Sequence, residues 1–182
     1  MNNFVLFARP WWVNLLFFVP IAAYIIFKGG LAIAKSRLFI VAVFGAAFGF
    51  VEAAVVVYLR AATGMYASVY QSNIMLNGVA KTLFTIEFFR EFATVVMLAC
   101  VALLAARNLK ERAAIFLWAF AFWDIFYYIW LWVAIRWPNS LTSPDVLFLI
   151  PVPWIAQVWF PLLISLASLV AVAVNCRSKT KI

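Results

Sequence analysis

The sequence contains no histidine, only two cysteines and few charged residues, and each shortage excludes a class of protein. Without histidine the chain offers no imidazole for haem or copper, no Glu-x-x-His di-iron site and no histidine-based acid–base catalysis. Cys100 and Cys176 form no CxxC pair and do not indicate a disulfide scaffold. Phosphate-binding and dinucleotide-binding motifs are also missing. No cofactor is therefore evident, and haem and copper are not expected.

Charged residues make up 11% of the 182 positions and hydrophobic residues 69%, far from the roughly 25% and 45–50% of a soluble domain. The mean hydropathy is +1.08. This composition is typical of an integral membrane protein, and it leaves no stretch polar enough for a separate aqueous domain. We therefore expect residues 1–182 to form a single all-α membrane domain whose first partner is the lipid bilayer.

Long apolar runs predict five membrane-spanning helices. A span needs about 20 mostly apolar residues, and most of these runs have Lys or Arg at their ends and Trp or Tyr near them, as interfacial anchors should be. The predicted polytopic bundle has spans at about 10–27, 38–59, 82–106, 113–135 and 154–174.

The distribution of Lys and Arg predicts the orientation of the bundle. Nine of them lie in loops 28–37 and 107–112 and in the C-terminal tail, whereas four lie at the opposite helix ends. The positive-inside rule then places the N-terminus outside and the C-terminus in the cytoplasm. Because the basic residues lie between apolar runs, the net charge of +8 reflects topology, and we expect no nucleic-acid partner.

Two connections on the outer side differ from ordinary loops. Residues 61–81 mix apolar and small polar residues without an acid, which predicts a segment along the membrane surface. Residues 137–153 run from a turn-rich start into a short apolar stretch that ends at Pro151 and Pro153. Such a stretch is too short to span, so we expect a re-entrant or interfacial segment near 144–153, with an ordinary extracellular loop as the alternative.

Ionisable residues inside the predicted helices mark the candidate site. Four acids lie within spans, between the outer half of the membrane and its midplane: Glu52, Glu87, Glu91 and Asp124. In the third span Glu87 shares a face with both Arg90 and Glu91, because residues three or four apart are neighbours on a helix. Four carboxylates against one guanidinium cannot all be ionised in a dry site. Some carboxyls are protonated, a cation neutralises them, or water fills the site.

Other residues add detail to this site. Tyr127 and Tyr128 lie near Asp124 and could donate hydrogen bonds to its carboxylate, although aromatic packing is the alternative. Asp145 follows Pro144 and is expected to be a turn residue. Oxygen ligands from Glu52, Glu87, Glu91 and Asp124 would suit a hard divalent cation such as Mg²⁺, Ca²⁺ or Mn²⁺. Arg90 opposes such binding and suits an anionic group instead.

The run "FWDIFYYIWLWVAIRWPNSLTSPDVLFLIPVPW", residues 122–154, together with Glu52 and the "EFFRE" of 87–91, resembles a pattern in an uncharacterised family of small multi-pass bacterial inner-membrane proteins. The resemblance covers about the C-terminal two thirds of the chain. It implies a location in the bacterial cytoplasmic membrane and carries no activity with it.

Three functions are compatible with these features. The first is transport of a small solute or cation through an outward-facing carboxylate site, coupled to proton exchange. The second is a membrane-embedded enzyme that acts on a lipid or isoprenoid headgroup, with Arg90 binding the anion. The third is a non-catalytic subunit or assembly factor of a larger membrane complex, in which the charged residues only hold helices together. Five helices are few for a lone transporter, so a homo-oligomer or a larger complex is expected.

Overall fold

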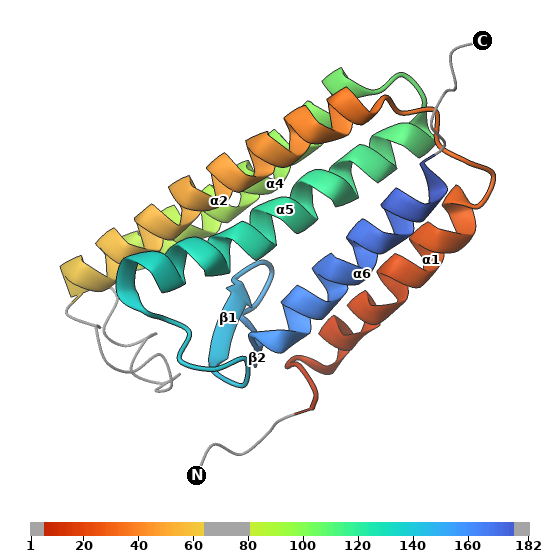
Figure 1. The fold of residues 1–182 in the computed structure, drawn as a ribbon. Coiled ribbons are helices and arrows are strands. Elements are labelled where there is room, and N and C mark those ends of the chain that lie inside the picture. The colour runs from red at the N-terminus through yellow and green to blue at the C-terminus, as the bar shows by residue number, and fades with distance from the viewer. Residues whose placement is uncertain (1–5, 64–80, 177–182) are drawn as a thin grey trace.

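The computed structural model describes residues 6–63 and 81–176, and this part of the chain is mostly helical. A 3₁₀-helix, η1, leads directly into α1, and two short strands precede the last helix. The elements are η1 (Trp11–Phe17), α1 (Phe18–Phe27), α2 (Lys35–Thr63), α4 (Lys81–Ala105), α5 (Leu109–Ile135), β1 (Pro144–Phe148), β2 (Trp154–Gln157) and α6 (Trp159–Asn175). Figure 1 shows α5 in the middle of the bundle, with the two strands gathered at one end of it.

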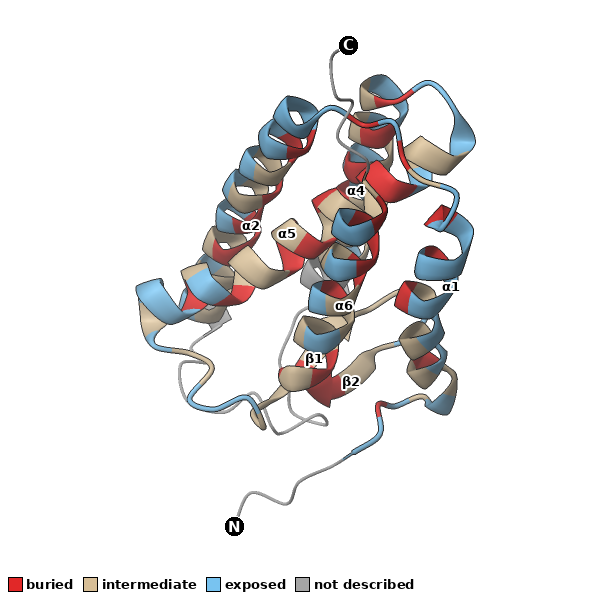
Figure 2. Ribbon diagram, turned by 45° about the vertical axis from the view of Figure 1, so that its right-hand side comes forward, coloured by how far each residue is buried: buried red, intermediate tan, exposed pale blue. Residues whose placement is uncertain are grey.

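Three helices, α2, α4 and α5, are long and apolar enough to cross a membrane. Their positions agree with the second, third and fourth predicted spans to within a few residues. The segments Trp11–Phe27 and Trp159–Asn175 are apolar but shorter. Many large apolar residues of the helices are exposed; Leu104, for example, is 88% exposed. Figure 2 shows exposed positions along the helices. Such a surface suits lipid contact, because lipid tails are as apolar as these side chains.

The two strands, β1 and β2, correct the prediction of an all-α chain. Residues 154–157, assigned to the fifth span, form β2, and the helix begins only at Trp159. β2 pairs antiparallel with β1, with a bulge between Val146 and Phe148. Pro151 and Pro153 lie in the connection, where their missing N–H groups interrupt no hydrogen-bond ladder. The short segment expected near 144–153 is therefore part of a β-hairpin of residues 144–157, hereafter called the hairpin.

The N-terminal segment pairs with the edge of β2 that β1 leaves open. Arg9 exchanges two backbone hydrogen bonds with Ile155, with N–O distances of 2.8 and 2.7 Å. β2 therefore lies between β1 and residue 9, which satisfies backbone groups that an unpaired edge would leave open. Trp12 and Trp154 meet nearby in an edge-to-face contact with centroids 5.1 Å apart.

The closest helix contact joins α2 to α5 through two glycines. A Cβ built on Gly45 would lie 2.9 Å from the carbonyl oxygen of Ala119, and one on Gly49 would lie 2.8 Å from that of Trp123. Only a residue without a side chain allows two helix backbones to approach so closely. This contact brings Glu52, three residues after Gly49, against the centre of the bundle.

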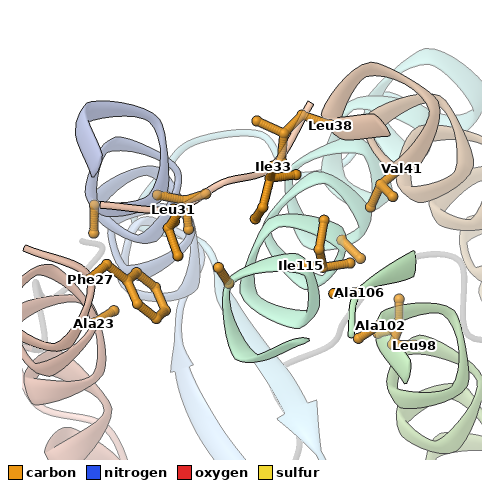
Figure 3. Close-up of a cluster of buried hydrophobic side chains, with 14 of the residues drawn as sticks. Ala23, Phe27, Leu31, Ile33, Leu38, Val41, Leu98, Ala102, Ala106 and Ile115 are labelled. Atoms are coloured by element: carbon orange, nitrogen blue, oxygen red, sulfur yellow. The ribbon is translucent and has the colours of Figure 1, made fainter. Parts of the chain in front are cut away.

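The main apolar core extends from the 28–34 connection to Trp123, where Phe148 of β1 packs against it. Figure 3 shows Phe27, Leu31, Ile33, Leu98 and Ile115 converging there from several helices and from the 28–34 connection. The Leu31 N–H donates to the Asn175 carbonyl at 2.8 Å and ties this connection to the end of α6. One end of the bundle is thus filled by side chains, and the cavity described below lies towards the other.

The predicted surface segment 61–81 lies largely outside the described residues. α2 continues to Thr63, and α4 begins at Lys81. The prediction for the residues between them stays open.

Candidate functional site

A cavity of about 1140 Å³ lies between the hairpin and the helices. Side chains from η1, α1, α2, α4, α5, α6 and both strands form its wall. All seven residues that the sequence analysis singled out line it: Glu52, Glu87, Arg90, Glu91, Asp124, Tyr127 and Tyr128. Asp145 lines it as well, so five of the six acidic residues in the chain face one space. The same wall contains three guanidinium groups, from Arg9, Arg60 and Arg90.

Arg90 of α4 connects two glutamates. Its Nε donates to Glu87 Oε2 at 2.7 Å, and its Nη2 lies 2.6 Å from the same oxygen. Its Nη1 forms an ion pair with Glu52 of α2. The buried Thr94 hydroxyl lies 3.1 Å from the Arg90 carbonyl oxygen and 3.4 Å from Glu52 Oε2. The guanidinium therefore pairs with carboxylates from two helices, and its single positive charge balances one of their two negative charges.

Glu91 points to a different partner. It follows Arg90 by one residue, a turn of about 100° around the helix axis. Its Oε2 accepts a hydrogen bond of 2.7 Å from the backbone N–H of Leu149, in the connection of the hairpin. Glu91 thereby links α4 to the hairpin, a contact between residues 58 positions apart in sequence.

Asp124 and Tyr128 differ from the expected arrangement. Asp124 is buried, and its Oδ2 accepts a hydrogen bond of 2.8 Å from the Ser165 hydroxyl of α6. The Tyr128 hydroxyl donates to Asp145 Oδ2, also at 2.8 Å, rather than to Asp124. The rings of Tyr127 and Tyr128 meet edge to face with centroids 4.9 Å apart. Tyr128, one of the two tyrosines considered as donors to Asp124, therefore donates to the hairpin instead.

Asp145 is the acidic residue that the sequence analysis misjudged. It lies in β1, paired with Ala156, and is only 5% exposed. Burial raises the pKa of Asp145 to about 6, although the Tyr128 hydrogen bond and the nearby Arg60 charge act in the opposite direction. Its short distance from Pro144 suggested a turn. A prediction of a strand that begins at Pro144 could have placed Asp145 in the site, because alternate residues of a strand point to the same face.

Two tryptophans in the cavity wall lack hydrogen-bond partners. The indole Nε1 atoms of Trp123 and Trp154 are buried, and neither finds an acceptor among the residues that the structure describes. Sequence spacing does not reveal this feature, because it depends on which groups surround each ring after folding.

The acidic side chains of the cavity were also considered as ligands for a metal ion. In residues 6–63 and 81–176, no group of three or more Cys, Asp and Glu side chains is placed to hold a metal ion. Glu52 and Glu87 share Arg90, whereas Glu91 and Asp124 contact separate elements. The hard divalent cation considered from the sequence stays a prediction.

The fold and the cavity together define a mostly helical protein with three helices suited to crossing a membrane and an acidic cavity among its helices. Comparisons with protein families, with characterised proteins and with solved structures give no match.

Proposed function

We propose that this protein is a five-span protein of the bacterial cytoplasmic membrane that exchanges a small solute or cation for protons through the cavity. One observation carries the proposal: five of the six acidic side chains in the chain line a single space among apolar helices. Ionisable groups at membrane depth are costly, and in membrane proteins they mark ion and proton pathways. The choice of membrane follows the resemblance of residues 122–154.

Five crossings require the two shorter helical segments to span as well. The 7 residues of η1 rise about 2.0 Å each and the 10 of α1 about 1.5 Å, so together they extend roughly 29 Å. The 17 residues of α6 extend about 26 Å. Both lengths are close to the roughly 30 Å hydrocarbon thickness of a bilayer. Arg9 pairs with Ile155 of β2. The C-terminal end of α6 lies at the opposite end of the bundle from the strands (Figure 1), as an odd number of crossings requires.

The charges in the cavity support proton exchange. Glu52 and Glu87 both pair with Arg90, whose one positive charge balances one of their two negative charges. Glu91 and Asp124 each accept one hydrogen bond and form no ion pair with any residue that the structure describes. An uncompensated charge at this depth costs about 2.5–3.5 kcal/mol on insertion scales. A proton or an incoming cation removes that cost, and the two compete for the same carboxylate.

The geometry favours transport over the two alternatives. An enzyme acting on a lipid or isoprenoid headgroup would need Arg90 to bind the anion, but Glu52 and Glu87 already hold that guanidinium. A non-catalytic subunit would need only the ion pairs of Arg90 to hold its helices together. That alternative gives the cavity no role. Because five helices are few for a lone transporter, a second copy or a larger membrane complex belongs to the proposal.

The proposed orientation predicts opposite labelling of two exposed positions. We expect Leu109→Cys to react with a membrane-impermeant maleimide only from the cytoplasmic side, and Ser140→Cys only from the outer side. Both side chains are exposed in the structure. Cys100 and Cys176 are replaced by alanine in the background, which serves as the control. Reaction of the two positions from the same side would contradict an odd number of crossings between them, and the reverse pattern would invert the orientation.

The transport proposal predicts cation-dependent proton movement in proteoliposomes. Vesicles with an acidic interior and a trapped pH indicator receive Na⁺, K⁺, Mg²⁺ or tetraphenylphosphonium outside. We expect one of these cations to drive proton efflux that depends on the protein, and Glu91→Gln and Asp124→Asn to abolish it because neither side chain can carry a proton as an acid. Glu111→Gln is the matched control, since Glu111 is the one acid outside the cavity wall. No protein-dependent efflux with any cation, or equal efflux in all three variants, would contradict the proposal.

A further inference from the structure

The size of the cavity points to a ligand larger than an inorganic ion. Pockets that hold drug-sized molecules measure about 300–1,000 Å³, and this cavity measures about 1140 Å³. Apolar side chains make up most of its wall, including Leu16, Val56, Val95, Leu117 and Ile164. A small hydrated ion gains nothing from such a wall, whereas a ligand with an apolar body buries its surface there.

Aromatic rings form a continuous group in the wall next to the acids. Trp123 packs against Phe120 at 5.2 Å between centroids and against Phe148 at 6.2 Å. Phe148 in turn packs against Trp154 at 5.4 Å. All four rings line the cavity. Faces of aromatic rings attract organic cations through the ring quadrupole, and tryptophan does so most strongly.

The charged residues in the cavity wall favour a ligand with a positive charge. Among the residues that the structure describes, five acids and three arginines line the cavity. Arg90 is bound by Glu52 and Glu87, and the Arg60 guanidinium lies 4.3 Å from the centroid of the Trp137 ring. Among the residues that the structure describes, Glu91 accepts a hydrogen bond from the Leu149 N–H and Asp124 accepts one from the Ser165 hydroxyl, and both donors are uncharged. A cationic head finds two carboxylates that form no ion pair with the described residues, whereas an anion meets more acidic than basic side chains there.

The buried indole groups add a second, independent requirement. Trp123 is only 6% exposed, and its Nε1 has no acceptor in the described part of the chain; Trp154 Nε1 has none there either. A buried donor without a partner loses its hydration and gains nothing in return. A ligand that brings an acceptor oxygen into the cavity would satisfy it.

We infer that the solute is an amphipathic organic cation that carries a hydrogen-bond acceptor. Its cationic head lies at Glu91 and Asp124, its apolar body lies against the aromatic rings, and its acceptor oxygen receives the Trp123 indole N–H. This inference names the substrate class of the proposed transporter and therefore rests on the proposed function.

The sign of the charge is tested with two ions of the same shape. Tetraphenylphosphonium and tetraphenylborate differ mainly in charge, so their binding to the full chain in nanodiscs separates charge from apolar burial. We expect saturable binding of the phosphonium, weakened about tenfold or more in the double variant Glu91→Gln and Asp124→Asn, and no saturable binding of the borate. Empty nanodiscs and Glu111→Gln are the controls. Equal binding of both ions, or phosphonium binding unchanged in the double variant, would overturn the inference.

The acceptor is tested with Trp123→Phe, which keeps an aromatic ring and removes the N–H. The probes are decyltrimethylammonium and its analogue in which one methyl is replaced by a 2-hydroxyethyl group. We expect the variant to bind the hydroxyl-bearing probe about five- to tenfold more weakly and the other probe within about twofold of the wild type. An equal loss for both probes would mean that the indole acts by packing alone, and the acceptor requirement would be wrong.

The experiments distinguish failure of the proposed transport from failure of the inferred substrate class. If tetraphenylphosphonium binds as expected but no cation moves protons, the substrate class stands and proton-coupled transport fails. If an inorganic cation drives proton efflux while none of the organic cations binds, transport stands and the substrate class is wrong.

Discussion

Replacing Arg90 with alanine is expected to lower the free energy of unfolding by about 3–5 kcal/mol, because it leaves two buried carboxylates without their counter-ion. Glu52 and Glu87 both pair with this guanidinium, and their side chains are only 9% and 13% exposed. The substitution also removes the ion pair that joins α2 to α4. Thermal unfolding of the purified protein in detergent, followed by the circular dichroism of the helices, measures the loss.

Glu91→Gln and Asp124→Asn are the matched comparison for Arg90→Ala. Each keeps the shape of the side chain and an oxygen that can accept the hydrogen bond from Leu149 or Ser165. Because each also removes a buried charge, we expect stability to stay the same or to rise, while proton exchange is lost. If both variants destabilise the protein as strongly as Arg90→Ala, the acids serve only to hold the helices together. The transport proposal would then lose its main support.

Gly49→Leu is expected to destabilise the protein by about 3 kcal/mol or more, at the upper end of what overpacking costs. Even the first carbon of a side chain would lie 2.8 Å from the Trp123 carbonyl oxygen and 2.9 Å from the Tyr127 backbone nitrogen. These are backbone atoms in the middle of α5, so α2 itself has to move away. Chemical or thermal unfolding in detergent measures the change.

The same displacement is expected to affect the site, because Glu52 follows Gly49 by less than one turn and would be drawn away from Arg90. Gly29→Ala is the control: its new Cβ would meet only the flexible end of Lys110, at 3.2 Å, and should change stability by no more than about 0.5 kcal/mol. If Gly49→Leu is as stable as this control, the close contact between α2 and α5 is not required for the fold.

The sequence predicted the long helices and the spacing of the charges within one of them. Apolar runs of sufficient length identify α2, α4 and α5, since a chain in lipid must satisfy its backbone hydrogen bonds within the helix itself. The Glu87–Arg90 pair follows from helical periodicity alone, because the two residues are one turn apart. Both features depend on neighbours in sequence, which is the information that a pattern of residues contains.

The hairpin could not be predicted in this way. Residues 154–156 are apolar and continue, after Gln157, into an apolar helical run, so the sequence pattern favoured a single helix. Their strand conformation depends on pairing with β1 on one side and with Arg9 on the other, and Arg9 lies about 146 positions away in sequence. Such long-range pairing outweighs local preference.

What the sequence by itself determined is therefore the apolar helical character of the protein and the presence of acidic groups within it. Only the tertiary structure decided which groups meet: Tyr128 donates to Asp145, Ser165 to Asp124, and the Leu149 N–H to Glu91. It also left the Trp123 indole without a partner in the described residues. The physical reason is that a hydrogen bond or an ion pair needs its two groups within about 3 Å of each other. That distance is set by how the helices and the hairpin pack.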